Sequence, residues 1–186
     1  MQTLETERLY LRKFIPNDFV GLYRFLRKPE NTIYTYFWPN SEEETKAFIN
    51  SSIQKAEEIP CVDFQFAAVT KKNGVLIGSC NFLLSGEGGS HIGWIVDSDY
   101  WNQGYGTEMG RALLRFGFEE LNLDCIKACC DAENIGSFRV MEKIGMRREG
   151  FLLNCRRAHK KSEKHKSDEV TYTLSKNEWK HKLLTI

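Results

Sequence analysis

The sequence predicts an α/β fold, in which a mixed and mainly antiparallel sheet is flanked by helices. Two strand-like runs, Phe64–Thr70 and Val75–Leu84, are joined by Asn73-Gly74, the strongest short-range signal for a hairpin. A third strand, His91–Val96, is followed by one amphipathic helix and then by the buried strand Cys125–Cys130. That order predicts a parallel strand pair with a right-handed crossover beside the antiparallel strands.

One strand and two helices are expected before the hairpin. Leu9 and Leu11 alternate with polar residues, which is the period of a half-buried strand. A helix opens at Pro16 and continues up to Pro29, with apolar positions at helical spacing: Phe19, Leu22 and Leu26. Ser41 and Glu44 form a capping box for the next helix. Its expected buried stripe ends before Pro60 and consists of Thr45, Phe48, Ile49, Ile53 and Ala56.

The second half of the chain predicts two more helices and two closing strands. The first helix follows the loop Tyr100–Glu108 and buries Met109, Ala112, Leu113 and Phe116. A shorter helix runs from about Asn134 to Ile144 and stops at Gly145, a natural left-handed cap. The closing strands are expected at Gly150–Ala158 and Glu169–Leu174.

Length and composition indicate one globular domain over residues 1–186. The chain is 41% hydrophobic, and its 26 Lys and Arg residues nearly balance 25 Asp and Glu residues. The resulting net charge of +1 argues against a protein that grips nucleic acid along its length. The first seven residues are polar, and no stretch approaches the roughly 20 apolar residues of a membrane span. We therefore expect a cytoplasmic protein with no membrane segment.

Six cysteines show neither Cys-x-x-Cys pairs nor interleaved histidines: Cys61, Cys80, Cys125, Cys129, Cys130 and Cys155. Several lie in apolar runs. We interpret them as reduced core thiols, and expect neither disulfides nor a metal site. None has a base partner evident in the sequence, so none is expected to act as a nucleophile.

The loop Tyr100–Glu108 is typical of a phosphate site, because Gly104 and Gly106 flank one residue at the start of a helix. Glycine lets the backbone turn and approach a ligand closely. The first N–H groups of a helix are unpaired and lie at the positive end of its dipole. A diphosphate is the expected ligand.

Three kinds of nucleotide loop compete for this segment. A Walker loop needs Gly-Lys-Ser/Thr, whereas this chain has Gly106-Thr107-Glu108, so that interpretation is excluded. A dinucleotide site fits the glycine spacing and Asp131 at the end of the next strand. However, its glycines should lie in the turn directly after the strand, and its sheet should consist of repeated βαβ units. An oxidoreductase therefore stays only a weak alternative.

The third interpretation uses a second motif, Asn134-Ile135-Gly136-Ser137, which opens the next helix and continues to Lys143-Ile144-Gly145-Met146. Together with the glycine loop, it resembles the GCN5-related N-acetyltransferase (GNAT) superfamily. The Asn-x-x-Ser pattern and the opening strand Glu7–Arg12 are similar to the RimJ/RimL-like branch, which acetylates ribosomal-protein N-termini. The resemblance spans nearly the whole chain, with the motifs in the same order.

The resemblance implies the acyl-CoA N-acyltransferase fold, in which the parallel strands splay where the cofactor arm enters. The co-substrate is then acetyl-CoA, with no metal. Backbone N–H groups from Gln103, Gly104, Tyr105, Gly106 and Thr107 would hold its pyrophosphate. Ile95 and Val96 would pair with the pantetheine arm and offer an N–H to the thioester oxygen. Asn134 and Ser137 would contact the far end of the arm and the sulfur.

Two positions depart from the commoner superfamily pattern. Trp101 stands where Gln or Arg is common, as is usual in the RimJ/RimL-like branch. Met141 replaces a tyrosine that protonates the leaving thiolate in many members, and methionine cannot donate a proton. A thiol pKa near ~8.5 makes thiolate a tolerable leaving group, so hydrogen bonding from Ser137 is the hypothesis for this role. The alternative is that Ser137 is an ordinary helix cap.

An amine nucleophile must lose a proton before it attacks, which requires a base or a water relay. The candidates are Glu87, His91 and Asp97. His91 has a suitable unperturbed pKa of ~6.5, and we select it as the catalytic base. The alternative is a surface histidine after a glycine-rich turn.

The acceptor amine stays open at this stage. The aromatic loop containing Tyr34, Tyr36, Phe37 and Trp38 lies where the family builds its acceptor wall, and plain core packing is the alternative. The hairpin Lys160–Lys166 could bind ribosomal RNA weakly, although charged hairpin tips are usually only solvated. We expect acetyl transfer to a protein N-terminus by a monomer or homodimer. The alternatives are a small amine (aminoglycoside or polyamine) and a CoA-binding regulatory module without turnover.

Overall fold

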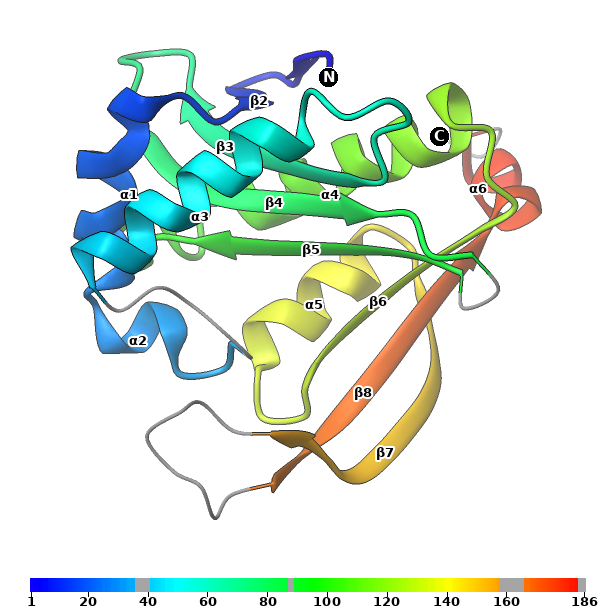
Figure 1. Ribbon diagram of the computed structural model, residues 1–186. Coiled ribbons are helices and arrows are strands. Elements are labelled where there is room, and N and C mark those ends of the chain that lie inside the picture. The colour runs from blue at the N-terminus through cyan, green and yellow to red at the C-terminus, as the bar shows by residue number, and fades with distance from the viewer. Residues whose placement is uncertain (36–40, 87–88, 158–165, 184–186) are drawn as a thin grey trace.

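The computed structural model describes residues 1–35, 41–86, 89–157 and 166–183. Eight strands form one sheet in the order β1-β2-β3-β4-β5-β6-β8-β7 (Figure 1). The strands are β1 (Leu4–Glu5), β2 (Leu9–Lys13), β3 (Asp63–Thr70), β4 (Leu76–Leu83), β5 (Ser90–Val96), β6 (Cys125–Asp131), β7 (Arg147–Arg157) and β8 (Lys166–Ser175). β5 and β6 are parallel, and the other neighbours pair antiparallel. The predicted mixed, mainly antiparallel sheet is confirmed.

Helices cover both faces of this sheet. They are α1 (Phe19–Leu26), α2 (Pro29–Thr32), α3 (Glu42–Lys55), α4 (Tyr105–Arg115), α5 (Ile135–Lys143) and α6 (Lys176–Leu183). In Figure 1, α3 (cyan) crosses in front of the sheet and α4 (green) lies behind it. One core cluster joins α1 and α3 to the sheet, and a larger one joins α4 and α5 to the opposite face.

Local signals in the sequence placed most of these elements. Ser41 caps α3 by accepting a hydrogen bond from the N–H of Glu44 at 3.1 Å, as predicted. Gly74 turns the β3–β4 hairpin with a φ of 68°, and Gly145 ends α5 with a φ of 89°. Both values lie in the left-handed region that favours glycine.

Four features were not predicted. β1 and α2 are too short to show a period, and α6 has little apolar pattern of its own; its Trp179 stacks on Phe118 at 5.7 Å. The fourth is a π-helical turn, Phe116–Glu120, which continues α4. A Cβ at Gly117 would lie 2.5 Å from Cδ1 of Ile126, so glycine allows this turn to pack directly on β6. These features depend on tertiary contacts.

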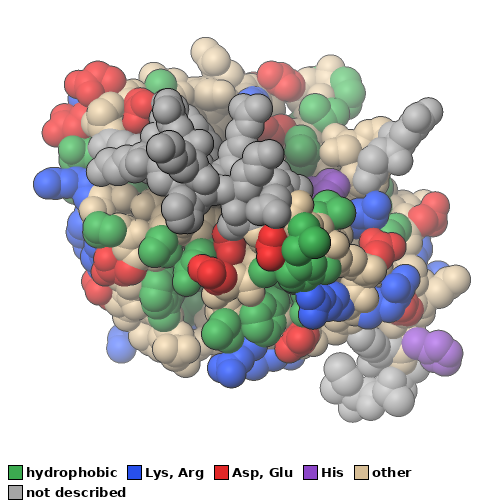
Figure 2. Space-filling view, turned by 90° about the horizontal axis from the view of Figure 1, so that it is seen from below, with side chains coloured by type: hydrophobic (Ala, Val, Ile, Leu, Met, Phe, Trp, Pro, Cys, Tyr) green, Lys and Arg blue, Asp and Glu red, His purple; other side chains and the backbone are tan. Residues whose placement is uncertain are grey.

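The charged surface agrees with the nearly equal numbers of acidic and basic residues. Figure 2 shows acidic and basic side chains interspersed on the face seen from below. Among the described residues, no helix is both long and apolar enough to cross a membrane. The described cysteines Cys61, Cys80, Cys125, Cys129 and Cys130 are thiols outside any disulfide, and burial raises the pKa of the Cys80 thiol.

Candidate functional site at the start of helix α4

The glycine loop opens α4 as an uncapped helix end. The backbone turns through positive φ at Asn102 (58°) and Gly104 (83°), and α4 begins at the next residue, Tyr105. Within the described part of the chain, no side chain caps this end. Because the N–H groups of the first helical turn have no partner inside the helix, they are available to an anion. The helix end lies where the sequence predicts a phosphate site, and the binding itself stays a prediction.

The two glycines of the loop serve different purposes. Gly104 supplies the left-handed turn. Gly106 provides room for α5, because a Cβ there would lie 3.3 Å from Cγ2 of Val140. Gly110, one turn later, would meet Cδ1 of Ile144 at 2.9 Å. Close packing of α4 on α5 is therefore a reason for Gly106 that sequence reasoning missed.

Arg8 fixes the start of α4 to the first strands of the sheet. Its backbone N–H and its Nε each donate to the Glu108 carboxylate at 2.7 Å, and its Nη1 donates to the Gln103 carbonyl at 2.9 Å. The guanidinium also lies 4.2 Å above the ring of Tyr105. Thr6 adds a hydroxyl donor to Glu108 at 2.5 Å. Arg8 thus supports both the loop and the first helical turn, a role that its place just before β2 does not reveal.

These contacts make the junction sensitive to acid. Burial tends to raise the pKa of Glu108, but hydrogen bonds from Thr6 and Arg8 outweigh it and hold the pKa below the ordinary value of 4.5. A folded-state pKa below the unfolded one gives stability that is complete above about pH 5 and is lost as the pH falls through the folded pKa. Glu108→Gln should therefore cost about 1–3 kcal/mol near neutral pH and less in acid. Urea titrations at several pH values measure this, and parallel profiles for parent and variant would contradict it.

The parallel strand pair opens toward the glycine loop. β5 and β6 pair at two positions, Ser90 with Ile126 and His91 with Lys127, and diverge beyond them. The N–H of Asp97 donates to Ile77 of β4 at 2.8 Å. Since alternate residues of a strand direct their backbone groups to the same edge, the backbone of Ile95 also faces β4 and that of Val96 faces the opening. Of the two predicted residues, Val96 is the one positioned to meet a ligand there.

Trp101 closes one side of this opening. Its indole Nε1 donates to the Val96 carbonyl at 2.7 Å, while the Trp101 side chain stays partly exposed. The bond ties the glycine loop back to the end of β5. From the sequence, Trp101 is only a departure from the commoner loop pattern.

Asn134 is the cap of α5. Its Oδ1 accepts from the N–H of Ser137 at 3.0 Å. The alternative interpretation of Ser137 as the helix cap is therefore wrong, and its hydroxyl is not required for capping. Met141 is 1% exposed and belongs to the core between α5 and the sheet, which agrees with a non-polar role.

The two described candidates for the base lie at opposite ends of β5. His91 is at the paired end and shares a face with Gly93 and Ile95. Asp97 follows the open end and is fully buried; Lys28 donates to its Oδ1 at 2.7 Å. These bonds with Asp97, and with Asp99, raise the pKa of Lys28. Asp97 is a buried ion-pair partner with no solvent-exposed surface, which argues against its use as the base.

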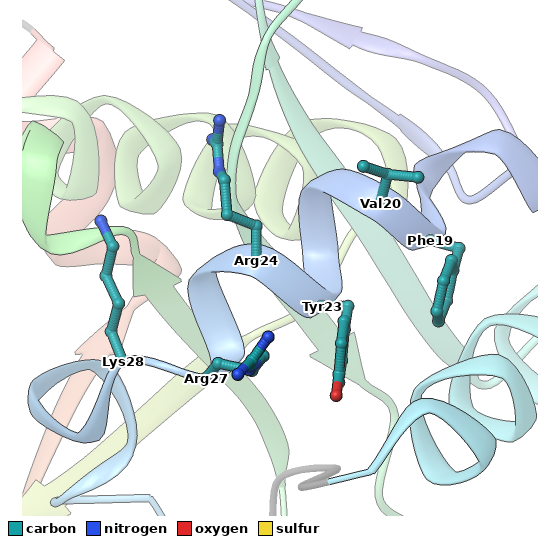
Figure 3. Close-up of a pocket in the computed structure, with 6 residues that line it drawn as sticks. All are labelled: Phe19, Val20, Tyr23, Arg24, Arg27 and Lys28. Atoms are coloured by element: carbon teal, nitrogen blue, oxygen red, sulfur yellow. The ribbon is translucent and has the colours of Figure 1, made fainter.

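Arg24 of α1 and Lys28, the residue before α2, extend to the same side of the helix in Figure 3, and both pair with Asp97, which follows β5. A surface cavity of about 430 Å³ is lined by α1 and the two residues after it: Phe19, Val20, Tyr23, Arg24, Arg27 and Lys28. Nη2 of Arg24 lies 3.7 Å from Oδ2 of Asp97. This cluster joins the α1–α2 region to the start of the glycine loop.

Several predicted residues lie outside the described part of the chain. They are Glu87, the aromatic residues Tyr36, Phe37 and Trp38, and the lysine hairpin 160–165. Tyr34, from the same aromatic segment, is described. The base candidate Glu87, the acceptor wall and the ribosome contact stay predictions.

Comparison with known proteins identifies a family. A family model described as "Acetyltransferase (GNAT) domain" matches residues 8–147. The uncharacterized N-acetyltransferase YnaD of Bacillus subtilis (strain 168) is 36% identical over 177 residues, which cover 95% of this chain and 98% of YnaD. The crystal structure of a GNAT-family acetyltransferase from Bacillus anthracis superposes with a TM-score of 0.81 at 30% identity, covering 95% and 99% of the two chains.

The fold also matches RimL, described as a ribosomal L7/L12 α-N-protein acetyltransferase in complex with coenzyme A. The TM-score is 0.80 at 16% identity, with 94% of this chain and 98% of RimL covered. At this identity the likeness establishes the fold.

Proposed function

The chain belongs to the GNAT acetyltransferase family, and on that premise we propose that it moves an acetyl group from acetyl-CoA to the N-terminal amine of a protein. One observation carries the proposal: Trp101, in the loop before α4, bonds the end of β5 where β5 and β6 have diverged, so this opening lies beside a helix start that no described side chain caps. A diphosphate and a thioester arm of one ligand fit these two features together.

The proposed donor site uses the backbone at both ends of the ligand. The N–H groups of Tyr105, Gly106 and Thr107 bind the pyrophosphate, with Gln103 and Gly104 forming the turn before them. The pantetheine arm passes along the open edge of β5, where the N–H of Val96 is available to the thioester oxygen. Asn134 uses its Oδ1 for the cap and keeps its amide nitrogen for the arm.

Proton transfer is assigned to two side chains. His91 accepts the proton of the acceptor ammonium, through water where the distance requires it. The amine nitrogen then attacks the thioester carbon and the carbon–sulfur bond breaks. The nitrogen loses its second proton as the amide forms, and this proton ends on the departing thiolate, which the Ser137 hydroxyl hydrogen-bonds. Ser137 suits this role because Asn134 already caps α5 and because Met141 is buried without a proton to donate.

A protein N-terminus is favoured as the acceptor over a small amine. Support comes from the opening strand around Arg8, the Asn-x-x-Ser motif and Trp101, which are similar to the RimJ/RimL-like branch, and from the fold likeness to RimL. Ribosomal proteins are the acceptor class proposed on this ground.

The test is CoA release in the presence of acetyl-CoA and an amine panel. We expect release with peptides that have free N-termini, a mass gain of one acetyl group on the first residue, and none with N-terminally blocked peptides. Ser137→Ala should lower kcat about tenfold and leave the Kd for acetyl-CoA unchanged. Calorimetric titration with acetyl-CoA measures binding of the donor, and titration with NADPH tests the oxidoreductase alternative.

Each alternative gives a different result. Turnover of aminoglycosides or polyamines without turnover of peptides would show that the acceptor is a small amine and not a protein N-terminus. Acetyl-CoA binding without release on any amine would indicate a regulatory module. An unchanged kcat for Ser137→Ala would remove Ser137 from the chemistry.

A further inference from the structure

The acceptor must reach the thioester from the face of the sheet opposite α4. On β5, Ile92 and Trp94 pack with the α4 side, whereas Ile95 packs with α1 and α3. By strand alternation, His91 and Gly93 share the α1 and α3 face with Ile95. The proposed donor occupies the other side, along α4. The α1 and α3 face is therefore where an amine can approach β5.

The buried apolar residues on the α1 and α3 face of the sheet end next to Gly93. Ala67, Val69, Leu76 and Ile95 lie under α1 and α3 and are buried. The next positions on the same face are Gln65 of β3, Asn81 of β4 and Gly93 of β5, which are aligned by the strand register and only partly buried. A short polar row thus crosses the sheet toward the opening between β5 and β6.

Within this row, Gln65 and Asn81 differ in how their side chains are used. Nε2 of Gln65 donates to Asp63 at 2.6 Å, and Lys55 donates to the other oxygen of Asp63 at 2.6 Å. By contrast, no hydrogen bond among the described residues uses the Asn81 side chain. Its amide is therefore available to a ligand, while the amide of Gln65 is committed to structure.

The Asn81 amide lies directly over Gly93. A Cβ built on Gly93 would be 2.6 Å from Oδ1 of Asn81, which is too close for any side chain at position 93 unless the amide moved. Glycine at this position keeps the amide oxygen next to the β5 backbone, between His91 and Ile95. Consecutive same-face residues of a strand are about 7 Å apart, so His91 is one side-chain length away.

We propose that Asn81 binds the acceptor amine, with its Oδ1 held over Gly93 to receive an N–H and orient the nitrogen toward the thioester; this rests on the proposed function. A primary amine or ammonium has several N–H donors, and an amide oxygen accepts one of them without taking the proton. The ammonium loses one of its other protons to His91 or to water, and the lone pair that this exposes on the nitrogen is directed at the carbonyl carbon of the thioester. Asn81 and Gly93 thus act as one unit that selects for an unblocked amine.

The test compares Asn81→Leu, Gly93→Ala and Gln65→Leu in the peptide assay. Asn81→Leu keeps the approximate size and removes the oxygen, so the acceptor KM should rise about tenfold to a hundredfold, as expected for a hydrogen bond to a charged group. Gly93→Ala should give a similar rise with Asn81 still present, because the new Cβ displaces its amide. The Kd for acetyl-CoA should stay within about twofold in both variants.

Asn81→Asp and Gln65→Leu separate substrate binding from folding. Asn81→Asp retains an oxygen at the same place and should keep the acceptor KM within about threefold of the parent. Gln65→Leu lies in the same row and should leave the acceptor KM unchanged. An unchanged KM in Asn81→Leu, or a loss in Gly93→Ala alone, would overturn the role of the amide. Absence of turnover in the parent enzyme would instead refute the proposed function.

Discussion

The Thr107→Asp variant is expected to fold normally and to lose most of its affinity for acetyl-CoA. Thr107 is the third residue of α4, at the end of the helix that no described side chain caps. A carboxylate there interacts favourably with the helix dipole, which contributes about 0.3–1 kcal/mol to folding. The same carboxylate lies next to the proposed pyrophosphate and repels it. Stability and ligand affinity should therefore change in opposite directions.

The size of the effect follows from the charges. Two like charges about 4 Å apart repel by about 4 kcal/mol at an effective dielectric constant near 20, and partial solvent exposure reduces this. We expect a loss of about 2–3 kcal/mol of binding free energy, or about a hundredfold in Kd. Calorimetric titration with CoA measures the loss, and urea unfolding measures the stability.

Thr107→Asn is the matched control, because asparagine has nearly the shape of aspartate without its charge. Its CoA affinity should stay within about threefold of the parent, since the proposed contacts come from the backbone. Equal affinities for the Asp and Asn variants, both folded, would show that no phosphate binds at this helix end.

Lys28→Met is expected to give the largest loss of stability, about 3 kcal/mol or more in the free energy of unfolding. Asp97 is 0% exposed, and Lys28 donates to its Oδ1 at 2.7 Å. The other oxygen, Oδ2, is buried without a hydrogen bond among the described residues. Without Lys28, the described side chains that still contact the carboxylate are Asn31, which donates a hydrogen bond at 3.3 Å, and Arg24, whose Nη2 lies 3.7 Å from Oδ2. A buried carboxylate with so little compensation is costly.

Arg24→Met provides the comparison for this prediction. Arg24 also pairs with Asp97, but at 3.7 Å and with its side chain 54% exposed, so its loss should cost less than about 1 kcal/mol. Adding Asp97→Asn to Lys28→Met should recover part of the loss, because the uncompensated charge is then removed. Equal unfolding free energies for the Lys28 and Arg24 variants would mean that the ion pair contributes little.

The elements that local signals define were predictable. Asn73-Gly74 can turn a hairpin with few contacts from elsewhere, and Ser41 caps α3 through a residue three positions away. The positive φ of Gly104 likewise follows from the glycine itself. In such cases the physical cause and the residue lie in the same short segment, so the pattern is visible without the fold.

The supports of the site were not predictable in this way. Arg8 and Glu108 are 100 residues apart, and nothing in either segment indicates their bonds. Asp97 was a reasonable candidate for the base until Lys28, 69 residues away, proved to be its partner. Ser137 could be separated from the role of cap only when Asn134 was found to fill it. The first two outcomes depend on which distant groups meet, and the third depends on which of two neighbouring polar residues takes the cap position.

Most strands, the main helices, the family and the position of the glycine loop follow from the amino-acid sequence alone, because periodicity, turn residues and motif order are local properties of the chain. Only the folded chain reveals which groups face the opening between β5 and β6, which carboxylates are neutralised by distant cations, and which polar side chains stay available to a ligand. Those properties depend on strand register and on the packing of α4 against α5, which bring together residues that no local pattern connects.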